Sequence, residues 1–314
     1  MSVSPPEARN TPSAKESTPG SRSGAARGAD VAAGSRKRRG PFAVAVFTML
    51  GSATSSQVGA ALGAHAFASI GPAGVVAVRQ LVAAAVLVPT ARPQVHRFSW
   101  RQRWPTLLLG LVFAVMNLSL YLAVDRIGLG LAVTLEFLGP LAVALAGSRT
   151  RIDALCAAGA GIGVVVLVLP GPTSDYLGVG FALLAAVGWA SYILTNRLVG
   201  ARVPGIQGPA AAAMISALAY LPVTVVLTVQ GAFTGAALGY ALCAGLLSSV
   251  LPYALDVMML RRVPTQFFGV FMSVHPVLAA LAGIVLLGQV LNVREWVGVL
   301  IVIASNGVAT SRRL

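Results

Sequence analysis

Four titratable side chains lie inside long apolar stretches of this 314-residue sequence. They are Arg79, Glu136, Asp256 and His275. An ionised side chain is costly in lipid, so such residues generally pair with one another or line a cavity that holds water. The sequence therefore predicts that these four side chains carry most of the chemistry of the molecule.

Arg79 and Glu136 are expected at a similar depth in a bilayer. Each lies about eight residues from the same end of its apolar stretch, which in a helix is ~10–12 Å from the surface. An arginine fork matches a carboxylate, and a glutamate matches an ammonium group. We therefore expect the two residues to pair or to bind the charged ends of a substrate, and a purely structural ion pair is the alternative.

Glu136, Asp256 and His275 are the candidates for carrying a proton. Asp256 lies five residues before Arg261, near the end of its stretch, so it is a gate, a proton site or simply an interfacial carboxylate. His275 precedes Pro276 near the expected midplane, and imidazole exchanges its proton near neutral pH. A neutral histidine that is hydrogen-bonded between helices is the alternative reading of His275.

Other polar and aromatic side chains are expected to line the same cavity. The predicted substrate-binding set adds Asn117, Tyr121, Trp189, Tyr192 and Tyr253 to Arg79 and Glu136, with Gln57 beside them. Tyrosine and tryptophan also settle at membrane interfaces, which is the alternative for the aromatic members. Trp189 is in the middle of its stretch, which favours the cavity.

Ten apolar stretches fill nearly all of the sequence after residue 40. The composition is 56% hydrophobic and 10% charged, with a mean hydropathy of +0.81, which excludes an ordinary soluble protein. Most stretches are close to the ~20 residues that a helix needs to cross a bilayer. The predicted spans are 42–66, 72–91, 105–124, 128–147, 152–170, 176–196, 207–229, 235–259, 264–287 and 293–311.

Basic residues alternate between the loops that join these spans. Twenty of the 23 Lys and Arg residues fall on one side of the threaded bilayer, whereas the other side has Arg126 and Arg294. Such residues concentrate on the cytoplasmic side, so we expect both termini there. The net charge of +14 is therefore a topology signal, and we expect no nucleic-acid partner. Residues 1–40 are predicted to form a disordered basic cytoplasmic tail.

The fourth and ninth spans share a sequence pattern. Leu131–Gly147 and Phe267–Gly283 align at a constant offset, so that Pro140 matches Pro276, and both segments end in Ala-Leu-Ala-Gly. The two spans hold the same place in two halves of five, and an odd number of spans inverts the second half. Inverted repeats are typical of transporters. We expect the halves at 41–170 and 171–314.

Both prolines are expected near the middle of the bilayer. They lie about eleven residues into their spans, or ~16 Å deep. A proline at this depth frees a backbone carbonyl and can kink the helix beside a central cavity. A passive kink that serves only packing is the alternative for Pro140 and Pro276.

The sequence contains no recognisable catalytic, metal or nucleotide motif. It has no phosphate-binding loop, dinucleotide fingerprint or Ser/His/Asp set, and its histidines and two cysteines are scattered. We therefore expect no enzyme, metal or cofactor. Glycines spaced four apart, at Gly59 and Gly63 and at Gly159 and Gly163, predict tight helix packing.

At these residues the chain resembles the EamA-type drug/metabolite transporter superfamily, and within it the threonine/homoserine exporter branch. The resemblance extends over about residues 42–310 and is most specific at LGLAVTLEFLGPLAVAL (129–145), which contains Glu136. Other matching stretches are GVVAVR (74–79), GWASYIL (188–194) and LPYALDVMML (251–260). Two departures are His275, where relatives have an acidic residue, and Gln289, where they commonly have Glu.

The resemblance implies an all-α membrane protein of ten transmembrane helices in two inverted five-helix EamA-type repeats. It further implies a bacterial inner, or plasma, membrane and proton-coupled export of small amino acids by alternating access. An exporter of another small metabolite or drug is the alternative within this class. A non-transporting membrane scaffold or sensor is the alternative in a different class, and the buried charges argue against it.

Overall fold

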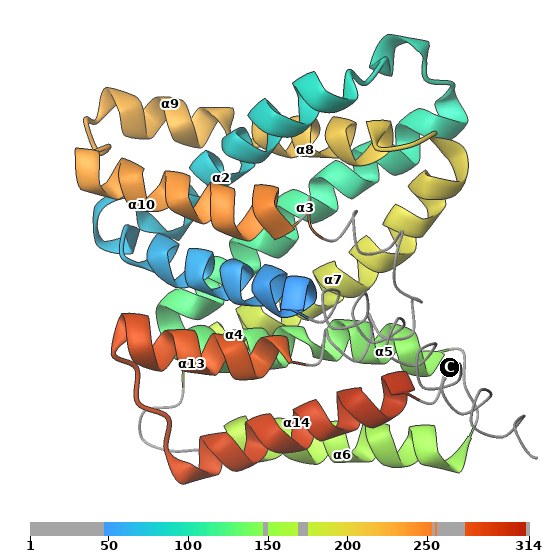
Figure 1. Cartoon of the computed structure of the whole chain (residues 1–314), viewed down its shortest axis with the longest axis vertical. Coiled ribbons are helices and arrows are strands. Elements are labelled where there is room, and N and C mark those ends of the chain that lie inside the picture. The colour runs from blue at the N-terminus through green and yellow to red at the C-terminus, as the bar shows by residue number, and fades with distance from the viewer. Residues whose placement is uncertain (1–46, 147–149, 169–174, 253–254, 256–273, 312–314) are drawn as a thin grey trace, which may run out of the picture. The chain divides into compact units, whose positions relative to one another are not determined.

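The computed structural model describes residues 47–146, 150–168, 175–252, 255 and 274–311. These residues are helices and short connections, with no strand among them (Figure 1). The helices are residues 47–64, α2 (Phe67–Ala91), η1 (Val95–Arg97), α3 (Trp100–Ile127), α4 (Leu129–Glu136), α5 (Leu138–Ala146), α6 (Arg151–Val168), α7 (Tyr176–Arg202), α8 (Gln207–Ala219), α9 (Leu221–Val229), α10 (Gly235–Gly245), the π-helical turn η2 (Leu246–Val250), α13 (His275–Leu287) and α14 (Val293–Ser311).

Three of the described helices are long and apolar enough to cross a membrane on their own. These are α2, α3 and α7, and the bent pair α8 and α9 makes a fourth if it counts as one span. The predicted count of ten complete spans is therefore not confirmed by helix length, although every predicted span overlaps described helical residues. Two of the apolar stretches are interrupted: α4 and α5 are separated at Phe137, and α8 meets α9 at a 40° bend. Parts of the predicted spans 42–66, 235–259 and 264–287 lie outside the described residues.

The second predicted span begins where the backbone of α2 bends. Gly71 has a φ of 66° inside the helix, a left-handed conformation that glycine adopts without steric penalty, and Pro72 follows it. Pro72 then lies in the first turn of the straight part of α2, where proline is tolerated. The predicted boundary at residue 72 thus coincides with this bend.

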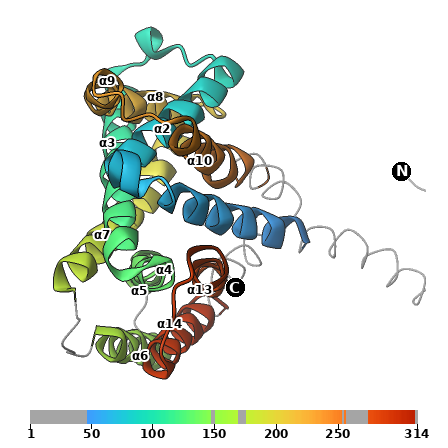
Figure 2. The ribbon, with the colours of Figure 1, turned by 90° about the vertical axis from the view of Figure 1, so that its left-hand side faces the viewer.

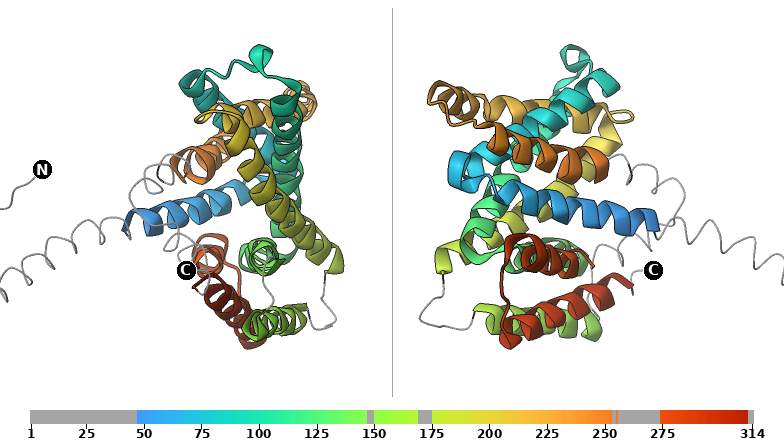
Figure 3. Two further views of the ribbon diagram at one scale, coloured as in Figure 1. Left: turned by 90° about the vertical axis from the view of Figure 1, so that its right-hand side faces the viewer. Right: turned by 60° about the vertical axis from the view of Figure 1, so that its left-hand side comes forward.

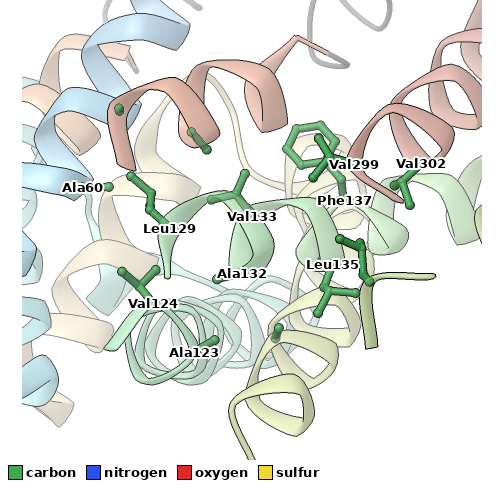
Figure 4. Close-up of a cluster of buried hydrophobic side chains, with 14 of the residues drawn as sticks. Ala60, Ala123, Val124, Leu129, Ala132, Val133, Leu135, Phe137, Val299 and Val302 are labelled. Carbon is green, nitrogen blue, oxygen red and sulfur yellow. The ribbon is translucent and has the colours of Figure 1, made fainter. Parts of the chain in front are cut away.

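Helix α4 lies at the centre of the largest buried cluster. Seven of its eight residues are buried, and Figure 4 shows Leu129, Val133 and Leu135 among side chains from other helices. The cluster includes Ala60 from the first helix and Val302 from α14. A helix that is apolar on all sides is expected in such a buried position. Glu136, its last residue, is therefore placed deep within the described helices.

The remaining helices pack in pairs. Helix α6 lies beside α14, α13 lies beside α4, and α3 packs against α7 and α8, as Figures 1, 2 and 3 show from different sides. Helix α2 packs against α8, α9 and α10. Members of several of these pairs occupy matching places in the two predicted halves.

Glycines allow these pairs to approach closely, which confirms the packing predicted from the four-residue spacing. A Cβ atom at Gly163 of α6 would lie 2.8 Å from Val302 of α14, and one at Gly159 would lie 2.7 Å from the Ser305 hydroxyl. Gly59 likewise faces Ser248 without room for a side chain. Small residues at such contacts let helices associate in lipid, where the hydrophobic effect gives little help.

Candidate functional site

Glu136 is a buried carboxylate at a break in its span. Only 4% of its surface is exposed, and the regular helix is interrupted at the next residue, Phe137. Pro140 has no N–H to donate to the carbonyl four residues earlier, which is that of Glu136 itself. Because Pro140 follows Glu136 by four residues, the side-chain carboxylate of Glu136 and a backbone carbonyl that lacks its helical donor occur at the same residue.

Arg79 of α2 binds the π-helical turn η2. Its Nε donates to the hydroxyl of Ser249 at 2.9 Å, and a terminal nitrogen donates to the backbone carbonyl of Ser248 at 3.1 Å. The guanidinium also lies over the ring of Tyr121, 5.5 Å from its centroid, at a distance typical of a cation–π contact. Three neutral groups therefore surround the charge of Arg79.

Arg79 and Glu136 do not form a direct ion pair in the described part of the chain. The ion pair found there joins Arg126 to Asp175, with 3.0 Å between Arg126 Nη1 and Asp175 Oδ2. Of the two arrangements expected for Arg79 and Glu136, direct pairing is therefore absent from the described residues in this conformation, and joint binding of a substrate stays a prediction.

The serines around the π-helical turn are functional candidates that sequence reasoning missed. Ser55 donates its hydroxyl to the carbonyl of Leu247 at 2.8 Å, and Ser248 donates its hydroxyl to the carbonyl of Ser56 at 2.7 Å. A π-helical turn leaves carbonyls outside the usual helical hydrogen bonds, and such turns occur frequently at functional sites. The detectable signal was the Ser-Ser pair in an otherwise apolar stretch.

His275 is linked to the first helix and to the break after Glu136. Its Nδ1 lies 3.2 Å from Nε2 of Gln57, and its ring centroid is 5.7 Å from that of Phe137. Phe137 in turn packs edge-on against Trp189 of α7, with 4.6 Å between ring centroids. The structure therefore brings Gln57, His275 and Trp189 to the same break in the fourth span.

Tyr121 has a buried hydroxyl without a hydrogen-bond partner among the described residues. Its side chain is 1% exposed, and its ring contacts Phe67 as well as Arg79. A buried polar group without a partner costs ~1–3 kcal/mol, which a bound polar ligand would recover. Tyr121 is thus the strongest of the predicted aromatic candidates.

The other predicted binding residues differ in where they lie. Asn117 is buried, but its amide donates to the carbonyl of Phe113 on its own helix at 2.8 Å. Tyr192 stacks on Phe113, with 5.4 Å between centroids, and packs against a separate buried cluster that includes Leu109. Tyr253 and Asp256 lie outside the described residues.

Gln289 holds the start of α4. Its side-chain oxygen accepts the backbone N–H of Leu129 at 3.0 Å, beside Gly128, whose φ is 82°. The first N–H groups of a helix have no partner within the helix, so this bond supplies one of them. Gln289, which the sequence marked as a departure from relatives, therefore positions the helix that carries Glu136.

Comparison with known proteins places this geometry in a transporter family. Residues 176–310 match the family model described as the EamA-like transporter family. The threonine/homoserine exporter RhtA of Salmonella typhimurium strain SL1344 is 36% identical over 261 residues, which are 81% of this chain and 87% of that protein. RhtA of Escherichia coli K12 is 35% identical over the same shares of the two chains.

More distant similarities concern part of the sequence or the fold alone. The uncharacterised transporter YwfM of Bacillus subtilis strain 168 is 29% identical over 125 residues, 40% of this chain and 42% of that protein. A crystal structure that is 19% identical superposes with a TM-score of 0.57 and covers 86% of this chain and 98% of its own. At that identity the likeness concerns the fold only.

Proposed function

The chain belongs to the EamA-like transporter family, in its threonine/homoserine exporter branch, and from that premise we propose that it exports threonine, homoserine or similar small amino acids. The observation that carries the proposal is the identity of 35–36% with two RhtA exporters over 81% of the chain. Its apolar helices and relatives make it a multi-pass membrane protein. The direction of transport comes from the relatives' activity.

In the proposed site, Arg79 and Glu136 bind opposite ends of a zwitterion. Arg79 exchanges its contacts with Ser249 and the Ser248 carbonyl for the substrate carboxylate, which is a better partner because it is charged. Glu136 binds the ammonium group, and the free hydroxyl of Tyr121 donates to the substrate. Buried polar groups that lack partners favour a substrate that supplies them.

Asn117, Trp189, Tyr192 and Tyr253 complete the proposed substrate-binding set. Trp189 is supported by its packing against Phe137, at the break beside Glu136. Asn117 donates to the carbonyl of Phe113, one turn earlier on α3, and Tyr192 of α7 stacks on the Phe113 ring. The two are therefore proposed to form a second part of the same path. Tyr253 is proposed from the sequence resemblance alone.

We place the transport cycle on two inverted halves, at residues 41–170 and 171–314, with both termini in the cytoplasm. The packing of α4 beside α13 and of α6 beside α14 supports this proposal, because each pair joins spans of equal rank in the two halves. The family match over residues 176–310 corresponds closely to the second half. The prolines Pro140 and Pro276 would let the paired spans bend as access alternates.

Proton coupling is assigned to Glu136, with His275 and Asp256 as further carriers. Glu136 and His275 are linked through Phe137, which neighbours one in sequence and stacks on the other. A carboxyl group that binds either a proton or the substrate ammonium would couple their movements in opposite directions. Asp256 is included from its position in the sequence.

Counterflow in proteoliposomes tests the substrate class. Vesicles that contain purified protein and excess unlabelled threonine should accumulate labelled threonine, and homoserine inside should support the same uptake. Arg79→Gln should abolish the exchange, whereas Arg97→Gln, which makes the same change at an exposed position, should not. Exchange of only some other metabolite would favour the other class of exporter, and no exchange by well-folded protein would favour a scaffold or sensor.

A further inference from the structure

A polar pocket lies between the start of α3 and the end of α7, where Arg101 and Arg202 are found. It has a volume of about 650 Å³ and is lined by Ser99, Arg101, Gln102, Trp104 and Arg202. None of these residues belongs to the proposed transport site. A ligand bound there would therefore be distinct from the transported substrate.

Interactions within the pocket fix the position of Arg202. Its guanidinium lies over the ring of Trp104 at 5.3 Å and donates to the carbonyl of Arg101 at 3.0 Å. Gln102 donates to the carbonyl of Arg202 at 2.8 Å, and its side-chain oxygen accepts the N–H of Ser99. An arginine held by stacking presents its remaining N–H groups in a fixed direction. Arg202 is thus held in a preformed position in the pocket, whereas the side chain of Arg101 is available to a ligand.

The two guanidinium groups have no acidic partner nearby in sequence. No Asp or Glu occurs between Asp30 and Asp125, or between Asp175 and Asp256, and these two stretches supply every residue of the pocket. The described ion pair involves Arg126, which is not part of the pocket. Two positive charges without an acidic partner among the described residues favour binding of an anion with several acceptor oxygens.

An exposed apolar stripe begins beside the pocket on α3. Leu108, Leu111 and Val115 are 43%, 53% and 48% exposed, and their spacing from Trp104 follows one face of the helix. Trp100 and Trp104 are also exposed, as is typical of residues at the boundary between hydrocarbon and headgroups. The pocket therefore lies where a lipid headgroup would lie, with its acyl chain against the stripe.

We propose that this pocket binds the phosphate of an anionic phospholipid. Arg101 and Arg202 contact the phosphate oxygens, Ser99 and Gln102 contact the polar part of the headgroup, and an acyl chain covers Leu108, Leu111 and Val115. Free phosphate offers the same oxygens but nothing to cover the stripe. Basic pockets between membrane helices are suited to such headgroups.

Native mass spectrometry of the full-length protein in detergent tests the proposal. Phosphatidylglycerol is titrated against wild type and against Arg101→Gln. The side chain of Arg101 forms no hydrogen bond among the described residues, and the Arg101 carbonyl that accepts from Arg202 is kept in the variant. The tightest lipid-binding step should weaken by about tenfold, equivalent to losing one charged hydrogen bond. Arg97→Gln, an equal loss of charge outside the pocket, should leave that step unchanged.

Two results would overturn the proposal. One is an equal loss of phosphatidylglycerol binding in Arg97→Gln and Arg101→Gln, which would mean that only total charge matters. The other is displacement of the lipid by glycerol phosphate at the same concentration, which would make a water-soluble phosphate the occupant. Arg202→Lys provides a second variant: it keeps the charge but loses the stacked fork, and it should weaken binding as well.

Discussion

Arg79 combines a charge in an apolar helix with neutral hydrogen-bond partners that a substrate could replace. Its contacts are the Ser249 hydroxyl, the Ser248 carbonyl and the ring of Tyr121. The two hydrogen bonds suit a guanidinium better than an ammonium because a planar fork donates in two directions, and the same planar group stacks on the ring of Tyr121. The identity of this residue, and not only its charge, should therefore matter.

Arg79→Lys should lower threonine transport by at least about tenfold, although the charge is kept, because one ammonium cannot reproduce the two-direction donation. Initial rates of threonine counterflow measure this effect. Arg97→Lys serves as the matched control and should transport at the wild-type rate. Normal transport by Arg79→Lys would show that the fork is not used.

Gln289 acts on the proposed site through the helix that carries Glu136. Gln289→Ala should lower the free energy of unfolding by ~1–2 kcal/mol, because the N–H of Leu129 loses its acceptor. Gln289→Glu should keep most of the stability, since a carboxylate oxygen can accept the same bond. Thermal unfolding of the purified variants measures the difference, and equal losses in the two would contradict this account.

Asp175 begins α7 and binds Arg126. The N–H of Gly178, and after it Arg126, hold the pKa of the Asp175 carboxyl below its usual range. A lowered pKa in the folded protein adds stability that is present above the unfolded pKa, near 4, and is lost as the pH falls through the folded value.

The melting temperature of Asp175→Ala should therefore be lower than that of wild type at pH 7, and the difference should shrink below about pH 4. Asp175→Asn should be less affected at pH 7, because asparagine still accepts the N–H of Gly178 while losing the charge. Melting curves over pH 3–7 in detergent provide the measurement. A difference that stays constant with pH would rule out the ionised carboxylate as its source.

At the scale of helices, close approach is made possible by single glycines. Gly139 of α5 is an example, since a Cβ atom there would collide with the backbone carbonyl of Ala186 on α7. Gly161 of α6 is the opposite case, because a Cβ atom added there would have no neighbouring atom within 4 Å. The two glycines allow a matched comparison within the same protein.

Gly139→Ala should destabilise the protein by ~1–3 kcal/mol, because the backbone of α7 cannot move aside as a side chain can. Gly161→Ala should be neutral or stabilising by up to ~1 kcal/mol, because alanine favours a helix. Both changes are followed by thermal unfolding in the same detergent. Equal effects would mean that the α5–α7 contact is not as tight as described.

The sequence predicted the helical segments well where hydropathy alone determines them. The predicted starts of the sixth and tenth spans, at 176 and 293, are those of α7 and α14. The sequence did not predict where a helix is broken. Hydropathy does not distinguish an unbroken helix from one that is interrupted at Phe137 or bent between α8 and α9. A proline accompanies each break, Pro140 after Phe137 and Pro222 at the start of α9, but hydropathy alone does not register it.

The candidate site was only partly predictable for a similar reason. Buried charge is visible in a sequence, so Arg79 and Glu136 were identified, but the partners of Arg79 were not. Ser248 and Ser249 reach Arg79 because η2 forms a π-helical turn, and the contact between Gln57 and His275 joins residues 218 positions apart. These arrangements depend on tertiary packing that no local pattern encodes.

At the scale of the whole molecule, proton-coupled export as proposed needs one carboxylate that links the substrate to the proton gradient. Glu136 is the suitable residue, because it is a buried carboxylate at the break in the fourth span. Glutamine at this position keeps the size and polarity of the side chain but can no longer release a proton.

Efflux of labelled threonine from proteoliposomes, with and without an imposed pH gradient, is the most direct test of this claim. Wild type should release threonine faster when the gradient is present. Efflux by Glu136→Gln should not depend on the gradient and should be slower by at least about tenfold. Arg97→Gln, incorporated at equal density, should behave as wild type. Gradient-driven efflux that persists in Glu136→Gln would contradict the account.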